Sequence, residues 1–335
     1  MTRPVPVPPW ALAIAAMSSV QLGSALSVGL IGSIGPAGTA WLRLSIGALV
    51  FLAVARPPLR SVRGRDVPAL LGLGVTTGVQ TIAFLAAIER IPLGTTVAIE
   101  FLGPLTVATL RSHSKRALTW PALALIGVIL LTQPWHGHVS ATGIGLAALA
   151  AAGWATYILL TQRVGDRFEG ITGLSLTIPV AAATAAIIGI PQAAGHLTPA
   201  TIAAGAGLAI LLPVLPFSFE MLALHHIKPA AFGTLMALEP AFGVLIGFLV
   251  LHQKLAPTQI LGILLVVIAG SAAQRGGRRD TQHQPPSAEP EGARPDLDPT
   301  RPDLDLTRPD LDPTREGQGR SLACRLLSSI VTGPK

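Results

Sequence analysis

Ten runs of mainly apolar residues, separated by short polar or Pro/Gly-containing segments, fill the first 273 residues of the chain. A helix needs about 20 such residues to cross the hydrocarbon core of a bilayer. The first run is longer than the apolar core of a signal peptide, so we predict that it is retained. The sequence therefore predicts an all-α integral membrane protein of ten transmembrane helices, at 10–33, 37–55, 67–88, 91–110, 118–133, 142–162, 171–190, 200–222, 229–251 and 257–273.

The charge distribution agrees with a membrane protein. Only 12% of the 335 residues are charged, which is too few to cover the surface of a soluble domain of this size. The whole net charge of +7 belongs to residues 1–274, because acidic and basic side chains balance in the remainder. Apart from Arg43, the basic residues of this part lie in short loops or near the N-terminus, where orientation in the membrane explains them better than nucleic-acid binding does. No nucleic-acid partner is therefore expected.

Cysteine chemistry is nearly absent from the chain. Cys324 is the only cysteine and lies in the polar tail, which excludes disulfides within one chain and thiolate metal sites. No His/Asp metal cluster, nucleophile motif or phosphate-binding loop accompanies it. We expect no cofactor, no metal and no enzymatic activity.

Basic residues predict the orientation of the spans. Cytoplasmic loops of membrane proteins are enriched in Lys and Arg. With ten spans and the N-terminus inside, only Arg90 and Lys254 fall in the opposite loops. Both termini are predicted to be cytoplasmic, in a bacterial inner membrane. The cytoplasmic basic residues would be Arg3, Arg56, Arg60, Arg63, Arg65, Arg111, Lys115, Arg116, Arg163, Arg167, Lys228, Arg275, Arg278 and Arg279.

A shift of 136 residues relates the two halves of the apolar part. It aligns LAAIERIPLG (85–94) with MLALHHIKPA (221–230) and brings Pro104 onto Pro240. The third and fourth spans then correspond to the eighth and ninth. Because five is odd, the second half would cross the membrane in the opposite sense, as in inverted-repeat transporters. The predicted domains are a first repeat at 1–140, a second at 141–273 and a tail at 274–335.

The tail carries three consecutive heptapeptides, RPDLDPT (294–300), RPDLDLT (301–307) and RPDLDPT (308–314). A coiled coil is excluded because every copy contains proline. The segment is poor in apolar residues and balanced in charge, so we predict a disordered cytoplasmic region.

Ionisable residues within apolar runs are the first candidates for a functional site, because such groups are costly in hydrocarbon unless they face a cavity or a partner. Glu100 and Glu239 lie near the middle of the fourth and ninth spans, at about 1.5 Å of rise per residue. Arg43 lies in the outer half of the second span. Glu220 is close to the inner end of the eighth span and can reach water.

Prolines accompany both glutamates. Pro104 removes the donor for the Glu100 carbonyl, and Pro240 removes that for the Met236 carbonyl. Carbonyls freed at membrane depth are tolerated where they line a cavity, so we predict one here, with simple kinking for packing as the alternative. Pro179 is predicted to interrupt the seventh span in the same way, and Pro213 and Pro216 the eighth. For Pro179 and Pro213, a kink that serves packing alone is an equal alternative.

Other residues of the runs allow two interpretations. Weaker candidates than the ionisable residues are Gln21, Gln80, Trp154 and Tyr157, of which Gln80 and Tyr157 are the predicted substrate contacts. A lone Gln or Tyr in a span is equally often a contact between helices, and tryptophans near span ends are usually interface anchors. Two GxxxG pairs are predicted to be helix-packing surfaces: Gly74 with Gly78, and Gly243 with Gly247.

At these residues the chain resembles the drug/metabolite transporter superfamily, and within it the EamA-type branch of ten-helix carriers. The resemblance covers about residues 10–272 and is carried by IPLGTTVAIEFLGPLTVA (91–108), LPFSFEMLAL (215–224) and FGTLMALEP (232–240), the first and last of which are typical of amino-acid exporters. One departure is that the Gly-Glu of the family before the tenth span is His252 and Gln253 here.

The resemblance implies export of threonine, homoserine or similar small amino acids against inward proton flow. A zwitterion needs an anion for its ammonium group and a cation for its carboxylate. We hypothesise that Glu100 binds the ammonium and competes for a proton, that Glu239 supports it, and that Arg43 binds the carboxylate. For Arg43, a structural salt bridge to one of these glutamates is an equal alternative.

Several functional alternatives stay open. The chain could export another metabolite or a cationic drug, although its low aromatic content, 4%, does not favour a large aromatic cavity. An intramembrane enzyme that uses the two glutamates, or a sensor or scaffold, is an alternative of another class. The expected partners are an amino-acid substrate, protons and membrane lipid, and a homodimer is left open.

Overall fold

We describe the protein from a computed structural model over residues 8–56, 62–110, 118–133, 140–165, 171–224 and 235–276. The heptapeptide tail, part of the segment aligned by the 136-residue shift and several basic loop residues lie outside these ranges. All regular structure within them is helical. Six of the helices are long and apolar enough to cross a membrane, and three shorter apolar helices accompany them.

The first two predicted spans form one long element, α1 (Pro9–Ala55), which is divided at Gly35. Gly35 has φ +72° and ψ 169°, so the helix direction changes there, and Pro36 starts the second half. The Oε1 atom of Gln192 accepts the backbone N–H groups of Ala37 at 2.7 Å and Gly38 at 3.1 Å. A side chain from a distant helix thus caps the second half of α1, where a connecting loop would otherwise lie.

The next three predicted spans appear as four helices, because the fourth span is interrupted. α2 is Val67–Ile88, α3 is Leu93–Glu100, α4 is Leu102–Leu110 and α5 is Thr119–Thr132. The interruption at Phe101 lies three residues before Pro104, whose missing N–H leaves the Glu100 carbonyl without its helical donor.

The second half begins with two long helices, α6 (Ala141–Gly165) and α7 (Ile171–Ala193). The eighth predicted span is divided into α8 (Pro199–Ala209), a π-helical turn η4 (Ile210–Val214) and α9 (Leu215–Leu224). Leu212 is non-helical there, and Ser19 Oγ donates a hydrogen bond of 2.8 Å to the Leu211 carbonyl. The break that Pro213 introduces is thus supported by α1.

The last two described helices are α11 (Glu239–Leu251) and α12 (Pro257–Gly276). The ninth predicted span began at 229, but residues 229–234 lie outside the described ranges and α11 starts ten residues later. Turn residues 237 and 238 precede it, and Pro240 occupies its second position. The proline therefore stands at the start of a helix, where its missing N–H is tolerated.

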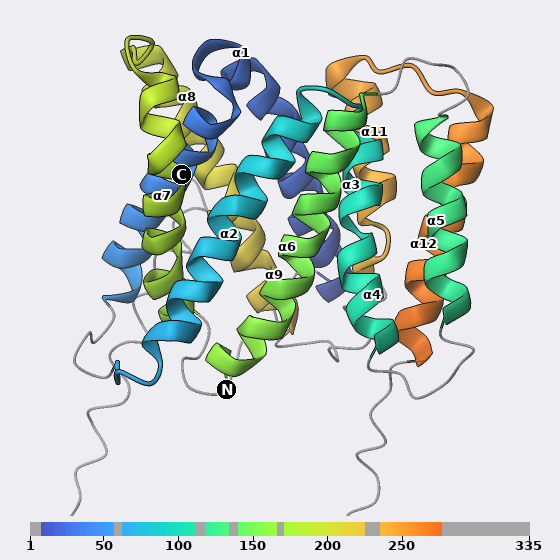
Figure 1. The fold of residues 1–335 in the computed structure, drawn as a ribbon, viewed down its shortest axis with the longest axis horizontal. Coiled ribbons are helices and arrows are strands. Elements are labelled where there is room, and N and C mark those ends of the chain that lie inside the picture. Colours follow the sequence, from blue (N-terminus) through green and yellow to red (C-terminus); the bar gives the residue numbers. More distant parts are fainter. Residues whose placement is uncertain are drawn as a thin grey trace, which may run out of the picture. The chain divides into compact units, whose positions relative to one another are not determined.

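Helices from the two halves pack against one another (Figure 1). α1 contacts α7, α8, α9 and α11; α2 contacts α6 and α7; α3 contacts α11; and α5 contacts α12. The predicted GxxxG surfaces lie at two of these contacts. Gly74 and Gly78 face Val180 and Ala181 of α7, and Gly243 faces Val97 of α3, so both predictions are confirmed.

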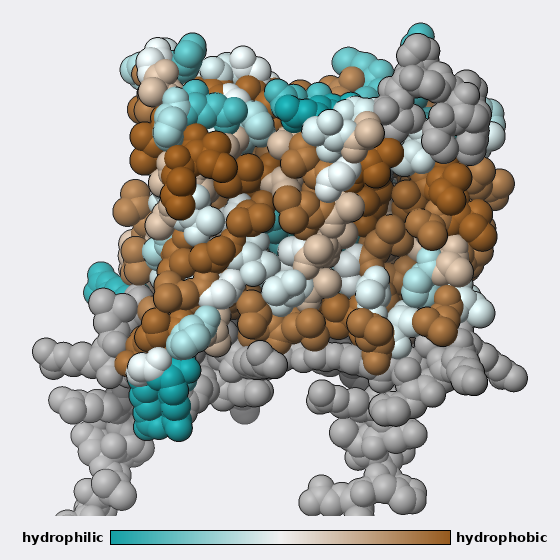
Figure 2. All heavy atoms as spheres, viewed as in Figure 1, coloured by the Kyte–Doolittle hydropathy of each residue, from teal (hydrophilic) through white to brown (hydrophobic). Residues whose placement is uncertain are grey.

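The outer surface is largely apolar in the face seen in Figure 2. Large apolar side chains are exposed on many helices, and their number suits lipid as the surrounding solvent better than water. Examples are Leu71, Val75, Ile187, Ile188, Phe248, Leu249, Leu261, Leu264 and Ile268.

Candidate functional site

Glu100 is the last residue of α3 and is buried, with 8% of its surface exposed. Its Oε1 atom accepts a hydrogen bond of 3.1 Å from Gln80 Nε2 of α2. The break after Glu100 places this carboxyl group where the helix is interrupted, as the sequence predicted from Pro104. The structure therefore brings together two of the predicted site residues.

Glu239 is the first residue of α11 and is also buried. Its Oε1 atom accepts a hydrogen bond of 3.3 Å from Gln21 Nε2 in the first half of α1. Its Oε2 atom is buried and has no hydrogen-bond partner among the described residues. Each candidate glutamate is thus held by one glutamine from another helix.

Gln21 is a weaker candidate in the sequence, yet the structure places it in contact with Glu239. It is almost completely buried, at 1% exposed, and its own Oε1 atom has no partner in the described part of the chain. In the sequence it is a lone glutamine in an apolar run, which is equally typical of a contact between helices. No local pattern could pair it with Glu239, which lies 218 positions away.

Arg43 lies in the second half of α1 and is 4% exposed. Its Nε and Nη1 atoms are buried and have no hydrogen-bond partner within the described ranges. Neither Glu100 nor Glu239 forms an ion pair with it. The charges of Arg43 and Glu100 nevertheless interact at longer range. The alternative of a direct salt bridge is therefore wrong in this conformation.

Tyr157 and Glu220 lie beside this group. Tyr157 of α6 packs against an apolar cluster that contains Leu70 and Leu73 of α2, and its environment includes the charge of Glu220. Glu220 of α9 also interacts electrostatically with Glu239, which in turn interacts with Glu100. The charged candidates therefore belong to one electrostatic group contributed by α1, α3, α9 and α11.

This group can recognise a small zwitterion. Buried carboxyl groups and glutamine oxygens can accept hydrogen bonds from an ammonium, and the free N–H groups of Arg43 can donate to a carboxylate. Metal binding has less support, since no group of three His, Cys, Asp or Glu side chains suited to a metal lies within the described ranges.

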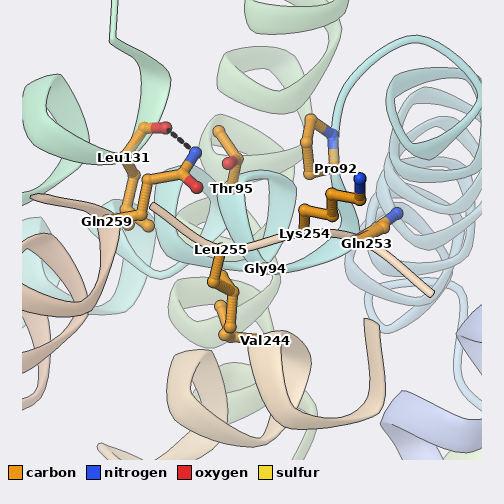
Figure 3. A pocket seen from close by; sticks show the side chains of 9 residues that line it. All are labelled: Pro92, Gly94, Thr95, Leu131, Val244, Gln253, Lys254, Leu255 and Gln259. Carbon is orange, nitrogen blue, oxygen red and sulfur yellow. Dashed lines mark hydrogen bonds between the residues drawn. The ribbon is translucent and has the colours of Figure 1, made fainter. Parts of the chain in front are cut away.

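A small hollow lies elsewhere, between the start of α3, the end of α5 and the connection from α11 to α12 (Figure 3). The predicted site residues do not line it. Gln259 donates to the Leu131 carbonyl at 2.9 Å beside the hollow, which ties α12 to α5. The lining residues are Pro92, Gly94, Thr95, Leu131, Val244, Gln253, Lys254, Leu255 and Gln259.

Gln253 lines this hollow, and His252 precedes it in the chain. His252 has φ +52°, a left-handed conformation in which glycine is the usual residue. Gln253 Oε1 accepts the Leu93 N–H at 3.2 Å at the start of α3. An amide oxygen is therefore sufficient to cap this helix in this chain, and a loop carboxylate is not needed for the contact.

Known proteins resemble the chain over most of its length. Residues 141–271 match the EamA-like transporter family. The threonine/homoserine exporter RhtA of Salmonella typhimurium (strain SL1344) is 35% identical over 290 residues, which are 84% of this chain and 96% of that protein. RhtA of Escherichia coli (strain K12) is 34% identical, over 82% of this chain and 94% of its own length.

Two further similarities are more distant. Protein PecM of Dickeya dadantii (strain 3937) is 27% identical over 68% of this chain and 78% of its own length. One protein of known crystal structure superposes with a TM-score of 0.54 at 17% identity, over 78% of this chain and 96% of that one.

Proposed function

Because this chain belongs to the EamA-like transporter family, we propose that it exports small amino acids of the threonine and homoserine kind in exchange for protons. The family consists of transporters rather than enzymes, and the chain is a multi-pass membrane protein. We also propose that it lies in a bacterial inner membrane and that protons are the coupling ion. The names of the relatives at 34–35% identity support the choice of substrate.

We propose that the described helices make ten crossings, with the two halves of α1 as the first two. Reversal of direction from one span to the next is supported by contacts between span ends. Gln192, near the end of α7, binds the turn of α1, and Gln253, beyond α11, binds the start of α3. Gly143, near the start of α6, lies against Ile91, just before α3. These ends would share the outer side.

The contacts between helices also support two inverted repeats, 1–140 and 141–273. In this division the halves of α1 correspond to α6 and α7, α2 to α8–α9, α3–α4 to α11, and α5 to α12. The contact between α2 and α7 then corresponds to the contact between α8 and α1. In the same way, the contact between α4 and α6 corresponds to the contact between α11 and α1. Two further contacts, α3 with α11 and α5 with α12, join corresponding helices.

The observation that carries the function is the set of buried polar atoms without partners on Arg43 and Glu239. Buried polar groups are normally paired, and unpaired ones cost about 1–3 kcal/mol each. A zwitterionic amino acid offers complementary groups to both. Glu100, Gln80 and Tyr157 complete the proposed substrate-binding group, and Pro104 and Pro240 mark the helix breaks beside it.

Proton exchange follows from the same carboxyl groups. A buried glutamate that lacks a bound cation is neutralised by a proton, so an ammonium group and a proton compete for it. Binding of a proton from outside would then release the amino acid there, and loss of that proton inside would allow the next amino acid to bind. Glu100 and Glu239 are the proposed sites of this competition.

The test is efflux of labelled threonine and homoserine from cells that express the wild type, Glu100→Gln or Glu239→Gln, with and without a proton gradient. We expect gradient-dependent efflux from the wild type and at least a tenfold lower rate in both variants, about 1.4 kcal/mol. Absence of gradient-dependent flux of any amino acid in a panel would overturn the proposal. Release of another metabolite instead would point to the alternative substrates.

Arg43→Gln tests the carboxylate-binding role separately. A variant that keeps its affinity for threonine and loses only protein stability would show that Arg43 is structural. We expect instead that the half-saturating threonine concentration rises at least tenfold.

A further inference from the structure

Buried polar atoms without partners cluster on a few residues of the chain. Five such atoms occur among the described residues, and four of them belong to Gln21, Arg43 and Glu239. On Gln21 and Glu239 the free atoms are oxygens, whereas on Arg43 they are nitrogens that carry hydrogen. Gln21 and Glu239 therefore suit a ligand group that donates hydrogen bonds, whereas Arg43 suits a group that accepts them.

The Gln21 amide has one paired and one free polar atom. Its NH₂ group donates to Glu239 Oε1 at 3.3 Å, and its own oxygen has no partner among the described residues. That oxygen faces Gly243, one turn further along α11, where an added methyl group would lie 3.5 Å from it. One hydrogen bond therefore leaves an oxygen free on each of its two residues, and Gly243 places no side chain beside the oxygen of Gln21.

The two buried glutamates differ in the charged residues around them. Glu100 has the positive charge of Arg43 in its surroundings. Glu239 instead interacts with two other acidic residues, Glu100 and Glu220, and forms no ion pair with a described basic residue. Of the two buried carboxyl groups, Glu239 is consequently the one whose charge needs a cation from outside the protein.

We propose that Gln21 Oε1 and Glu239 Oε2 form an acceptor pair that holds the primary ammonium group of the substrate. The inference rests on the proposed function and exchanges the roles that the sequence suggested for the two glutamates: Glu239 binds the ammonium, and Glu100 stays beside Arg43. Two acceptors require at least two N–H donors. A primary ammonium has three, whereas an N,N-dimethyl ammonium has one, so the pair selects unsubstituted amines.

Binding to the purified full-length protein in lipid nanodiscs tests the pair. Isothermal titration would compare threonine with N,N-dimethylthreonine on the wild type, Gln21→Met and Gln80→Met. We expect the wild type to prefer threonine about tenfold, the factor that corresponds to about 1.4 kcal/mol. Gln21→Met should lower this preference to about twofold or less, because the second acceptor is gone.

Gln80→Met is the matched control, since it removes the same amide from the other buried glutamate. It should keep the tenfold preference, even if both ligands bind more weakly. Gln21→Leu, which also removes the second acceptor, should lower the preference in the same way and serves where Gln21→Met does not fold. An unchanged preference in Gln21→Met, an equal loss in Gln80→Met, or a wild type that binds neither ligand would overturn the pair.

Efflux of labelled threonine distinguishes this inference from the proposed function. A tenfold preference without any threonine efflux by the wild type would leave the pair standing and overturn the exporter. Proton-driven efflux together with an unchanged preference in Gln21→Met would do the opposite.

Discussion

Each buried glutamate is paired with a glutamine from another helix, Glu100 with Gln80 and Glu239 with Gln21. The sequence predicted both glutamates, because an ionisable group in an apolar run is costly and so has a reason to be there. It could not predict the pairs. Which glutamine meets which glutamate depends on the packing of α1 against α11 and of α2 beside α3, and lone glutamines have no pattern that encodes it.

The surroundings of the two glutamates predict opposite effects on stability when their charge is removed. Glu100→Gln leaves the buried Arg43 without its nearby negative charge, and we expect a loss of about 2 kcal/mol, less than the roughly 3–5 kcal/mol of a direct buried pair. Glu239→Gln removes an acidic group that lies near two other acidic residues and has no basic partner among the described residues, so stability should stay equal or rise. Thermal unfolding of both purified variants at one pH checks this order.

A Glu239→Gln variant that unfolds at a lower temperature than Glu100→Gln would contradict the assignment of charges. Circular dichroism of both variants before heating is the control that they fold.

At the scale of elements, the sequence predicted where helices occur more accurately than where they break. The ranges of α2, α5, α6 and α12 agree with the predicted runs to within a few residues. Pro104 and Pro213 predicted two interruptions that occur, whereas the interruption predicted at Pro179 is wrong, because α7 continues through it. The non-helical residue in η4 is Leu212, one residue before its proline. Exact positions depend on which neighbour can bind the carbonyls that the break exposes, as Ser19 does for the carbonyl of Leu211.

The turn of α1 predicts a contrast between two glycines. Gly35→Ala should destabilise the protein by about 2 kcal/mol or more, since its φ is positive and the new methyl group would lie 2.2 Å from the Gln192 side chain. Gly32→Ala, three residues earlier in the helix, meets no atom within 4 Å and should stabilise by about 0.5–1 kcal/mol. Unfolding temperatures of the two variants should therefore move in opposite directions.

If Gly35→Ala unfolded at the wild-type temperature, the cap that Gln192 provides could not be the constraint that forms this turn.

The α2–α7 contact predicts a further effect of a single methyl group. In Gly74→Ala the methyl would lie 2.4 Å from Val180 Cβ and 2.8 Å from the Thr177 carbonyl oxygen, so the helices must separate. We expect a loss of about 1–3 kcal/mol, the usual range for overpacking. Gly207→Ala in α8, where nothing lies within 4 Å, is the matched control and should cost nothing. Thermal unfolding in detergent measures both, and equal effects would argue against close packing at Gly74.

For the whole molecule, the sequence predicted the number of apolar runs but not which helices meet. Contacts such as α1 with α7 and α2 with α6 join segments from different halves, and their side chains are too uniformly apolar to specify partners. Small residues are the best sequence signal of a helix–helix contact, because two helices can approach closely only where their side chains are small. The GxxxG pairs predicted contact surfaces, although not the helices that occupy them.

The proposed orientation predicts which loops can be labelled from outside the cell. Lys254 and Arg65 are both exposed, in the connection from α11 to α12 and just before α2 respectively. In a Cys324→Ser background, Lys254→Cys should react with a membrane-impermeant maleimide in intact cells, and Arg65→Cys only after permeabilisation. Labelling of Arg65→Cys but not of Lys254→Cys in intact cells would show that the orientation is opposite to the proposed one. Labelling of both variants in intact cells would contradict the proposed ten spans.

The short helix α5 has a consequence for the surrounding lipid. It has 14 residues, bounded by Leu118 and by the left-handed Gln133, and therefore rises about 21 Å, against about 30 Å for a typical hydrocarbon core. Acyl chains that touch α5 must compress or tilt to avoid a hydrophobic mismatch. The bilayer beside α5 would be locally thinned, and lipids with shorter chains would accumulate there.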